Sequence, residues 1–121
     1  MQTRTLARSE WTKFFDSLSR IIAGSRATLE VLQDDLGAQM EVEQSPLTGI
    51  SYDPSGLELH FVTRGGHLVH RIENPERIEV EEPDDGFISA LEIQAPGEPA
   101  FILRLEAPVN SRLLPAAADV T

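Results

Sequence analysis

Cysteine is absent from this chain of 121 residues. Its absence excludes disulfides, thiol nucleophiles and thiolate metal ligands, and it fits a reducing compartment, so we expect a cytoplasmic protein. Long apolar runs are also missing, because no stretch approaches the roughly 20 residues that cross a bilayer. The N-terminal segment MQTRTLARSEW has no apolar core of a signal peptide. The sequence therefore predicts no membrane partner.

Basic residues are scarce. Ten lysines and arginines stand against 20 aspartates and glutamates, which gives a formal net charge of −10. A surface this negative repels phosphate groups, so we expect no nucleic-acid partner, and the charge keeps the protein soluble. The length fits one domain. We expect a single globular domain over residues 1–108 and a flexible C-terminal tail over residues 109–121, where no period is visible.

Residues 9–24 carry the pattern of one amphipathic helix. Ser9 is a good residue to cap the first turn, and Gly24 is placed to end the helix in a left-handed conformation. Between them the apolar residues recur at helical spacing: Trp11, Phe14, Phe15, Leu18, Ile21 and Ile22. The preceding residues 1–8 are predicted to form a short basic arm.

After Gly24 the period of the apolar residues changes from 3.6 to 2, which is typical of strands. Turn residues separate the predicted strands, which cover residues 26–33, 36–44, 48–52, 57–63, 67–73, 77–82, 87–95 and 100–107. In the turn DPSG, we expect Asp53 to bond the backbone two residues on. The pattern predicts an α+β protein: an N-terminal helix packed on a bent antiparallel β-meander of six to eight strands. A small closed barrel and an open two-layer sheet both fit.

The same periods predict which residues form the core. The predicted core residues are Trp11, Phe15, Leu18, Ile22, Leu29, Val31, Met40, Val42, Ile50, Leu59, Phe61, Ile72, Ile78, Val80, Leu91, Ile93, Phe101, Leu103 and Leu105.

The segment 57–73 holds all three histidines. If Gly65 and Gly66 form a two-residue hairpin turn, Arg64 pairs with His67, and alternation directs His70 inward with Phe61. His60 and His67 then face solvent, roughly 13 Å apart along the strands. Zinc needs several ligands around one ion, so this register predicts no metal site and no metal cofactor.

Catalytic spacing is also missing. A serine nucleophile needs a base within hydrogen-bond reach, and the predicted register places no histidine near a serine. We therefore predict no catalytic residue and no cofactor. His70 is interpreted either as a hydrogen-bonded core histidine or as a polar group in an apolar ligand cavity, where Tyr52 and Thr63 would join it.

Acidic residues crowd the segment 79–85. Alternation directs Glu79 and Glu81 outward, and Pro83 interrupts the strand. Charges and proline are typical of a sheet edge that resists further pairing, so an edge strand is the favoured interpretation, with a docking patch for a basic partner as the alternative.

Four segments carry a resemblance to a known family: RTLARSEWTKFFDSLS, PLTGISYDP, HLVHRIENPERIEVEE and LEIQ. They resemble a family of small bacterial proteins classed as a domain of unknown function, from about residue 3 to about residue 108. The resemblance implies a single-domain soluble bacterial protein, and it supplies no activity to carry over.

These observations favour a non-enzymatic protein-interaction module that binds a protein partner or a second copy of itself. The alternative is a small-molecule ligand-binding domain with His70, Tyr52 and Thr63 in its cavity. An enzyme that uses His70, or a pair such as Asp53 and Arg71, is the third hypothesis.

Overall fold

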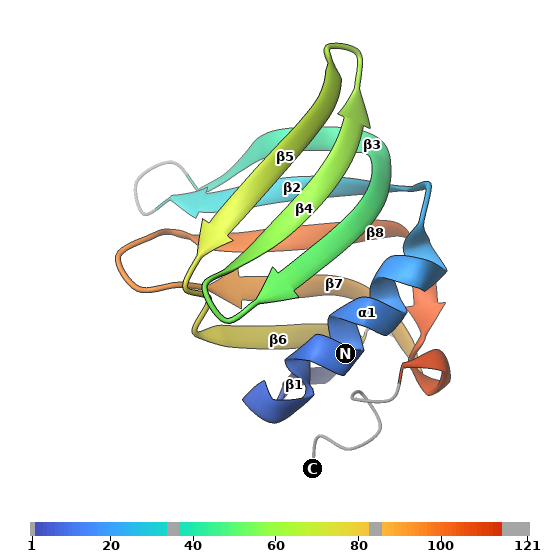
Figure 1. Ribbon diagram of the computed structural model, residues 1–121, viewed down its shortest axis with the longest axis vertical. Coiled ribbons are helices and arrows are strands. Elements are labelled where there is room, and N and C mark those ends of the chain that lie inside the picture. The colour runs from blue at the N-terminus through green and yellow to red at the C-terminus, as the bar shows by residue number, and fades with distance from the viewer. Residues whose placement is uncertain (1, 34–36, 83–85, 115–121) are drawn as a thin grey trace.

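The computed structural model describes residues 2–33, 37–82 and 86–114 (Figure 1). These residues form, in chain order, β1 (Gln2–Thr5), η1 (Arg8–Glu10), α1 (Trp11–Ile22), β2 (Ser25–Gln33), β3 (Gly37–Asp53), β4 (Gly56–Thr63), β5 (Gly66–Glu73), β6 (Arg77–Glu82), β7 (Phe87–Gln94), β8 (Ala100–Asn110) and η2 (Ser111–Leu113). None of the helices in this described part is long and apolar enough to cross a membrane.

All eight strands join one antiparallel sheet in the order β1-β6-β7-β8-β2-β3-β4-β5. The predicted α+β class is confirmed. β1 and β5 end this order, and no backbone pairing joins them in the described residues, so hydrogen bonds do not close the sheet into a barrel. The sheet is strongly bent: Figure 1 shows β3, β4 and β5 crossing in front of β2 and β8.

Helix α1 packs on β3 through its apolar stripe (Figure 1). The predicted stripe is confirmed except for Ile21, which is 37% exposed. Gly24 has φ +85°, as its predicted role in ending the helix requires. The predicted cap is wrong, because Ser9 lies inside η1 and the residue at the cap position is Glu10, without a side-chain hydrogen bond to the helix.

β3 is one strand of 17 residues where two separate strands were predicted. Its pairing with β2 shifts between the pairs Leu29–Val42 and Glu30–Met40. This bulge turns Met40 toward the side of Glu30 and leaves it 62% exposed, so the prediction that Met40 lies in the core is wrong. The other predicted core residues are all buried.

The N-terminal arm forms β1, which pairs with β6. β6 therefore has β1 on one side and β7 on the other, and the interpretation of β6 as an edge strand is wrong. Glu82 of β6 is 6% exposed and forms an ion pair with Arg4 of β1. Pro83, Asp84 and Asp85 of the acidic run lie outside the described residues.

The C-terminal end of β8 extends past residue 108. Val109 is 5% exposed, and Leu114, after η2, is fully buried. The predicted boundary at residue 108 therefore falls inside β8. The part of the predicted tail from residue 115 to residue 121 lies outside the described residues.

Candidate functional site

The β4–β5 hairpin, residues 56–73, holds the histidines and most of the candidate residues. Its turn is formed by Arg64 and Gly65, because Thr63 pairs with Gly66. The predicted turn at Gly65 and Gly66 is therefore wrong, and every pair is offset by two residues. Leu59, for example, pairs with His70. Since side chains alternate with a period of two, this offset leaves each side chain on its predicted face.

The offset brings His60 and His67 together. His60 pairs with Val69 and Val62 pairs with His67, so the two imidazoles are diagonal neighbours on the outer face. Their ring centroids are 5.6 Å apart, and their ring planes are nearly parallel. The predicted separation of roughly 13 Å is therefore wrong. Across the described residues, no group of three or more histidine, aspartate or glutamate side chains is arranged to hold a metal ion.

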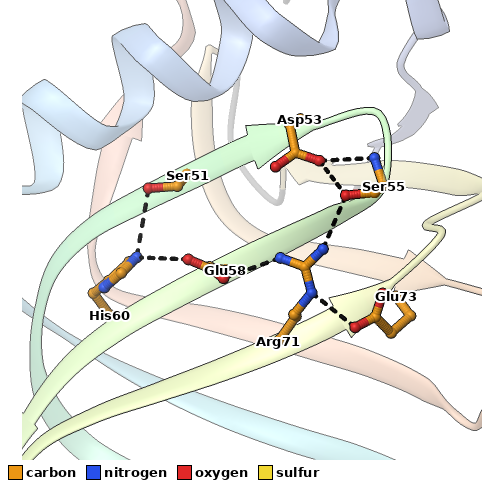
Figure 2. Close-up of polar contacts among 7 residues, drawn as sticks. All are labelled: Ser51, Asp53, Ser55, Glu58, His60, Arg71 and Glu73. Carbon is orange, nitrogen blue, oxygen red and sulfur yellow. Dashed lines mark hydrogen bonds and ion pairs between the residues drawn. The ribbon is translucent and has the colours of Figure 1, made fainter.

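A polar network lies on the outer face of β3, β4 and β5, with Arg71 at its centre (Figure 2). The Arg71 guanidinium donates from Nε to Glu73 at 2.8 Å, from Nη1 to Glu58 at 3.0 Å and from Nη2 to the Ser55 hydroxyl at 3.0 Å. The hydrogen bond to Glu73 is the main cause that raises the pKa of Arg71, and the bond to Glu58 adds to it.

Gly56 leaves room for that guanidinium. A Cβ at position 56 would lie 2.5 Å from Nη2 of Arg71, which is closer than a carbon atom can approach. Gly56 also pairs with Glu73 and ends the DPSG turn. The glycine thus lets the arginine lie against the backbone and reach the turn.

The DPSG turn forms as predicted. Asp53 accepts hydrogen bonds from the Ser55 amide at 2.8 Å and from the Ser55 hydroxyl at 2.5 Å. The bond from the Ser55 hydroxyl is the largest cause that lowers the pKa of Asp53, followed by the bond from the Ser55 amide, and the charge of Arg71 contributes further. Asp53 and Arg71 are therefore linked through Ser55 and not by a direct ion pair among the described contacts.

Ser51 of β3 lies next to His60, so the prediction that no histidine lies near a serine is wrong. Its hydroxyl oxygen is 3.4 Å from Nε2 of His60, and Glu58 Oε1 is 3.5 Å from the same nitrogen. In a catalytic triad the serine and the carboxylate contact opposite nitrogens of the imidazole, so that the carboxylate orients the base. Here both contact one nitrogen, and the arrangement does not make a proton relay.

On the inner face, His70 is partly buried and packs edge-on against Phe101 of β8, with ring centroids 5.0 Å apart. Its Nε2 atom is buried and has no hydrogen-bond partner within residues 2–33, 37–82 and 86–114. His70 is thus an inner-face residue as predicted, but the hydrogen bond expected of a core histidine is missing at Nε2.

Tyr52 and Thr63 do not gather around His70. Tyr52 packs against Trp11 and Phe15 of the helix, with centroid distances of 5.6 Å and 6.0 Å. Thr63 lies at the hairpin turn. Its hydroxyl donates to Gly66 O and accepts from Gly65 N, each at 3.2 Å. Thr63 lies roughly 13 Å along β4 from the level of His70. It lines a different feature, an open groove between the bend of β3 and the hairpin tip.

The outer edge of the hairpin is the backbone of β5, the last strand of the sheet order. Pairs flanking a two-residue turn exchange hydrogen bonds, and such pairs alternate along an antiparallel ladder. Counting from the pair Thr63–Gly66, the even-numbered residues of β5 bond to β4, and the bond from Asn74 N to Ser55 O at 2.9 Å fits this phase. The amides and carbonyls of His67, Val69, Arg71 and Glu73 therefore point away from the sheet.

Apolar side chains are exposed on this hairpin. Val62, Leu68 and Val69 are 45%, 40% and 42% exposed. The hairpin has two acids, Glu58 and Glu73, and two arginines, Arg64 and Arg71, so it contributes no net charge. The formal charge of −10 therefore belongs to the rest of the chain.

Comparison with known proteins identifies the family. A family model described as "Family of unknown function (DUF5335)" matches residues 2–113. An uncharacterised protein of Aquifex aeolicus (strain VF5) is 37% identical over 108 residues, which cover 88% of this chain and 94% of that protein. No solved structure matches the chain. The match over nearly the whole fold, from β1 to η2, shows that the chain belongs to this family of unknown function, DUF5335.

Proposed function

We propose that the protein is a non-enzymatic protein-interaction module that binds its partner along the outer edge of β5. The observation that carries this proposal is the open edge itself: eight residues long, at the end of the sheet order, with exposed Leu68 and Val69. Unpaired amides and carbonyls on such an edge are a template for another strand, and apolar side chains beside them add affinity.

The outer-face network supports binding better than catalysis. Arg71 uses all three nitrogens in contacts with Glu73, Glu58 and Ser55. The contacts of His60 do not make a relay. Such a network holds a hairpin in shape and leaves no group positioned as base or nucleophile. We further propose a bacterial, cytoplasmic protein without a nucleic-acid partner, because a charge of −10 repels phosphates.

The test uses Val69, whose amide points away from β4. Val69→Pro removes that outward donor and leaves the pairing with β4 in place, and Val69→Ala is the matched control that keeps the donor. Native mass spectrometry of each protein isolated from its own host should show a complex for the wild type and Val69→Ala but not for Val69→Pro. A bare monomer in all three, or a complex that survives in Val69→Pro, would overturn the proposal.

A second candidate, a small-molecule binder, is favoured by one observation: the buried Nε2 of His70 has no hydrogen-bond partner among the described residues. A buried polar atom without a partner is costly, and a ligand that supplies a hydrogen bond there would remove the cost. Tyr52 and Thr63, the other two residues of the predicted ligand site, do not lie beside His70, so His70 carries this hypothesis.

The binder hypothesis has its own measurement. An added mass of a few hundred daltons on the wild-type chain, absent from His70→Phe, would support it. Tyr52→Phe and Thr63→Val then test whether the other two residues contribute. The same mass on His70→Phe, or no added mass on the wild type, would refute a ligand held at His70.

A further inference from the structure

We propose that the partner of the β5 edge is a second copy of this chain, paired β5 to β5 in antiparallel direction about a two-fold axis at His70. This inference rests on the proposed function, since it names the occupant of the same edge. Cyclic two-fold dimers are the commonest protein assemblies, and in them one surface pairs with itself. Self-pairing therefore requires that the side chains of β5 complement those of a second β5 strand that runs in the opposite direction.

The two-fold axis restricts the pairing. Residues opposite each other in an antiparallel pair have side chains on the same face, so only pairs with both numbers even or both odd are allowed. The axis must therefore pass through a residue and not between two residues. In β5 the candidate centres near the middle of the strand are Val69, His70 and Arg71.

These three centres differ in which charged side chains they place opposite each other. A centre at Val69 places His67 opposite Arg71 of the second copy, and a centre at Arg71 places the two arginines opposite each other. A centre at His70 places His67 opposite Glu73 of the second copy, twice by symmetry. An imidazole N–H donates to a carboxylate, and the described contacts of Glu73 use only one of its two oxygens.

The centre at His70 also aligns the apolar residues. Leu68, 40% exposed in one copy, lies opposite Ile72 of the second copy on the inner face. The outward-pointing amides and carbonyls of His67, Val69, Arg71 and Glu73 then match in two hydrogen-bonded pairs repeated by the axis, 67 with 73 and 69 with 71. This register uses seven residues of each strand, 67 to 73.

Long-range charge points to the same element. Two chains of charge −10 repel each other, and the repulsion is weakest where the approaching surfaces carry least net charge. The β4–β5 hairpin carries none. The other end of the sheet order, β1, offers only four residues. Electrostatic repulsion between two copies is therefore weakest when they approach each other through this hairpin.

The absence of cysteine makes the register directly testable by crosslinking. In the proposed dimer the two residues at position 70 form a non-hydrogen-bonded pair, with Cα atoms about 4.5 Å apart, which a disulfide can span. His70→Cys should therefore form a covalent dimer under mild oxidation. The control is Val69→Cys, whose side chain is exposed but whose copies lie diagonally across the pair, too far apart for a disulfide.

A charge exchange tests the same register without a change at His70. His67→Glu faces Glu73 of the second copy and should weaken dimerisation about tenfold. Combining His67→Glu with Glu73→Lys should restore it, because opposite charges face each other again. Sedimentation equilibrium of the purified chain over micromolar to millimolar concentrations gives the dissociation constants.

Each outcome decides the proposal. Dimerisation of the purified chain, selective crosslinking of His70→Cys and recovery in the double variant support it. Crosslinking of Val69→Cys, or a dimer that the charge exchange leaves unchanged, overturns the register. A purified chain that stays monomeric overturns self-pairing. If a complex with a different protein is then lost in Val69→Pro, the interaction module stands without the dimer, and if no complex exists, both proposals fall.

Discussion

The sheet ends at β1 on one side and at β5 on the other, and the two end strands are held in different ways. β1 has four residues, and its Arg4 forms an ion pair with Glu82, with side chains only 19% and 7% exposed. β5 has eight residues, and its Arg71 lies in an outer network, 32% exposed. The ion pair of the short strand has a buried carboxylate, whereas the charges in the network of the long strand are more exposed.

The chain beyond β1 adds to this difference. The Leu6 amide bonds Ile78 O at 2.9 Å, and Trp11 Nε1 donates to Leu6 O at 3.3 Å. The guanidinium of Arg8 lies 4.8 Å from the centre of the Trp11 ring. These contacts tie the end of β1 to the helix and the sheet. The comparison indicates that β1 is tied to the helix and the sheet, while β5 ends the sheet order without a described strand on its outer side.

The largest loss of stability is expected from breaking the Arg4–Glu82 ion pair. Arg4→Ala leaves the Glu82 carboxylate buried without its cation, which should lower the free energy of unfolding by about 3 kcal/mol. Chemical denaturation of the wild type and the variant gives this difference. Arg4→Met combined with Glu82→Leu is the control and should recover most of the stability. A loss below about 1 kcal/mol for Arg4→Ala would show that β1 is not held by this pair.

Proline at two adjacent positions tests the open edge of β5. Leu68→Pro removes an amide that bonds to β4, whereas Val69→Pro removes an amide that points outward. Leu68→Pro should therefore destabilise the monomer by about 2 kcal/mol more than Val69→Pro does. Denaturation at concentrations too low for association makes the comparison. An equal or larger loss in Val69→Pro would reverse the hydrogen-bond direction inferred for β5.

The Arg71 network should contribute less to stability than the Arg4–Glu82 pair, because its charges are more exposed. Arg71→Ala breaks three hydrogen bonds at the surface, where water replaces them, so its loss of stability should be well below that of Arg4→Ala. Arg71→Lys keeps the charge but cannot bond three partners at once, and it should fall between the wild type and Arg71→Ala. If Arg71→Ala costs as much as Arg4→Ala, the contrast between the two ends of the sheet fails.

The smallest effect concerns acid stability at the DPSG turn. The pKa of Asp53 is lowered in the folded protein, so its carboxylate favours the folded state above the unfolded pKa of about 4. That contribution is lost as the pH falls through the lower folded value. Asp53→Asn should therefore be less stable than the wild type at neutral pH, and the difference should shrink below about pH 4. A difference that is constant with pH would contradict this assignment.

The β4–β5 hairpin shows which features could be predicted from the sequence and which could not. Alternation placed Leu59, Phe61, His70 and Ile72 on the inner face, and the structure agrees. The register was wrong because a slip of two residues keeps every side chain on its face, so the apolar pattern cannot detect it. The neighbours on the outer face do change, and this is why the stacking of His60 on His67 was not foreseen.

Met40 and Ser51 show a second limit. The bulge in β3 moves Met40 to the solvent side, and no residue type in that segment marks it unambiguously. Ser51 meets His60 because β3 pairs with β4 on either side of the DPSG turn. The one local signal available was the turn, since DPSG fixes the pairing of β3 with β4 and thereby places Ser51 opposite Glu58.

The sequence by itself determined the elements that depend on neighbouring residues: the apolar stripe of α1, the left-handed Gly24, the DPSG turn and the alternation of the strands. These follow from backbone geometry and from the burial of one face, which are local properties. Only the tertiary structure decided that β1 pairs with β6, that Arg4 meets Glu82, and that β5 is an end strand of the sheet. Those contacts join residues far apart in the chain, and the order of strands in a sheet is chosen by the packing of the whole sheet.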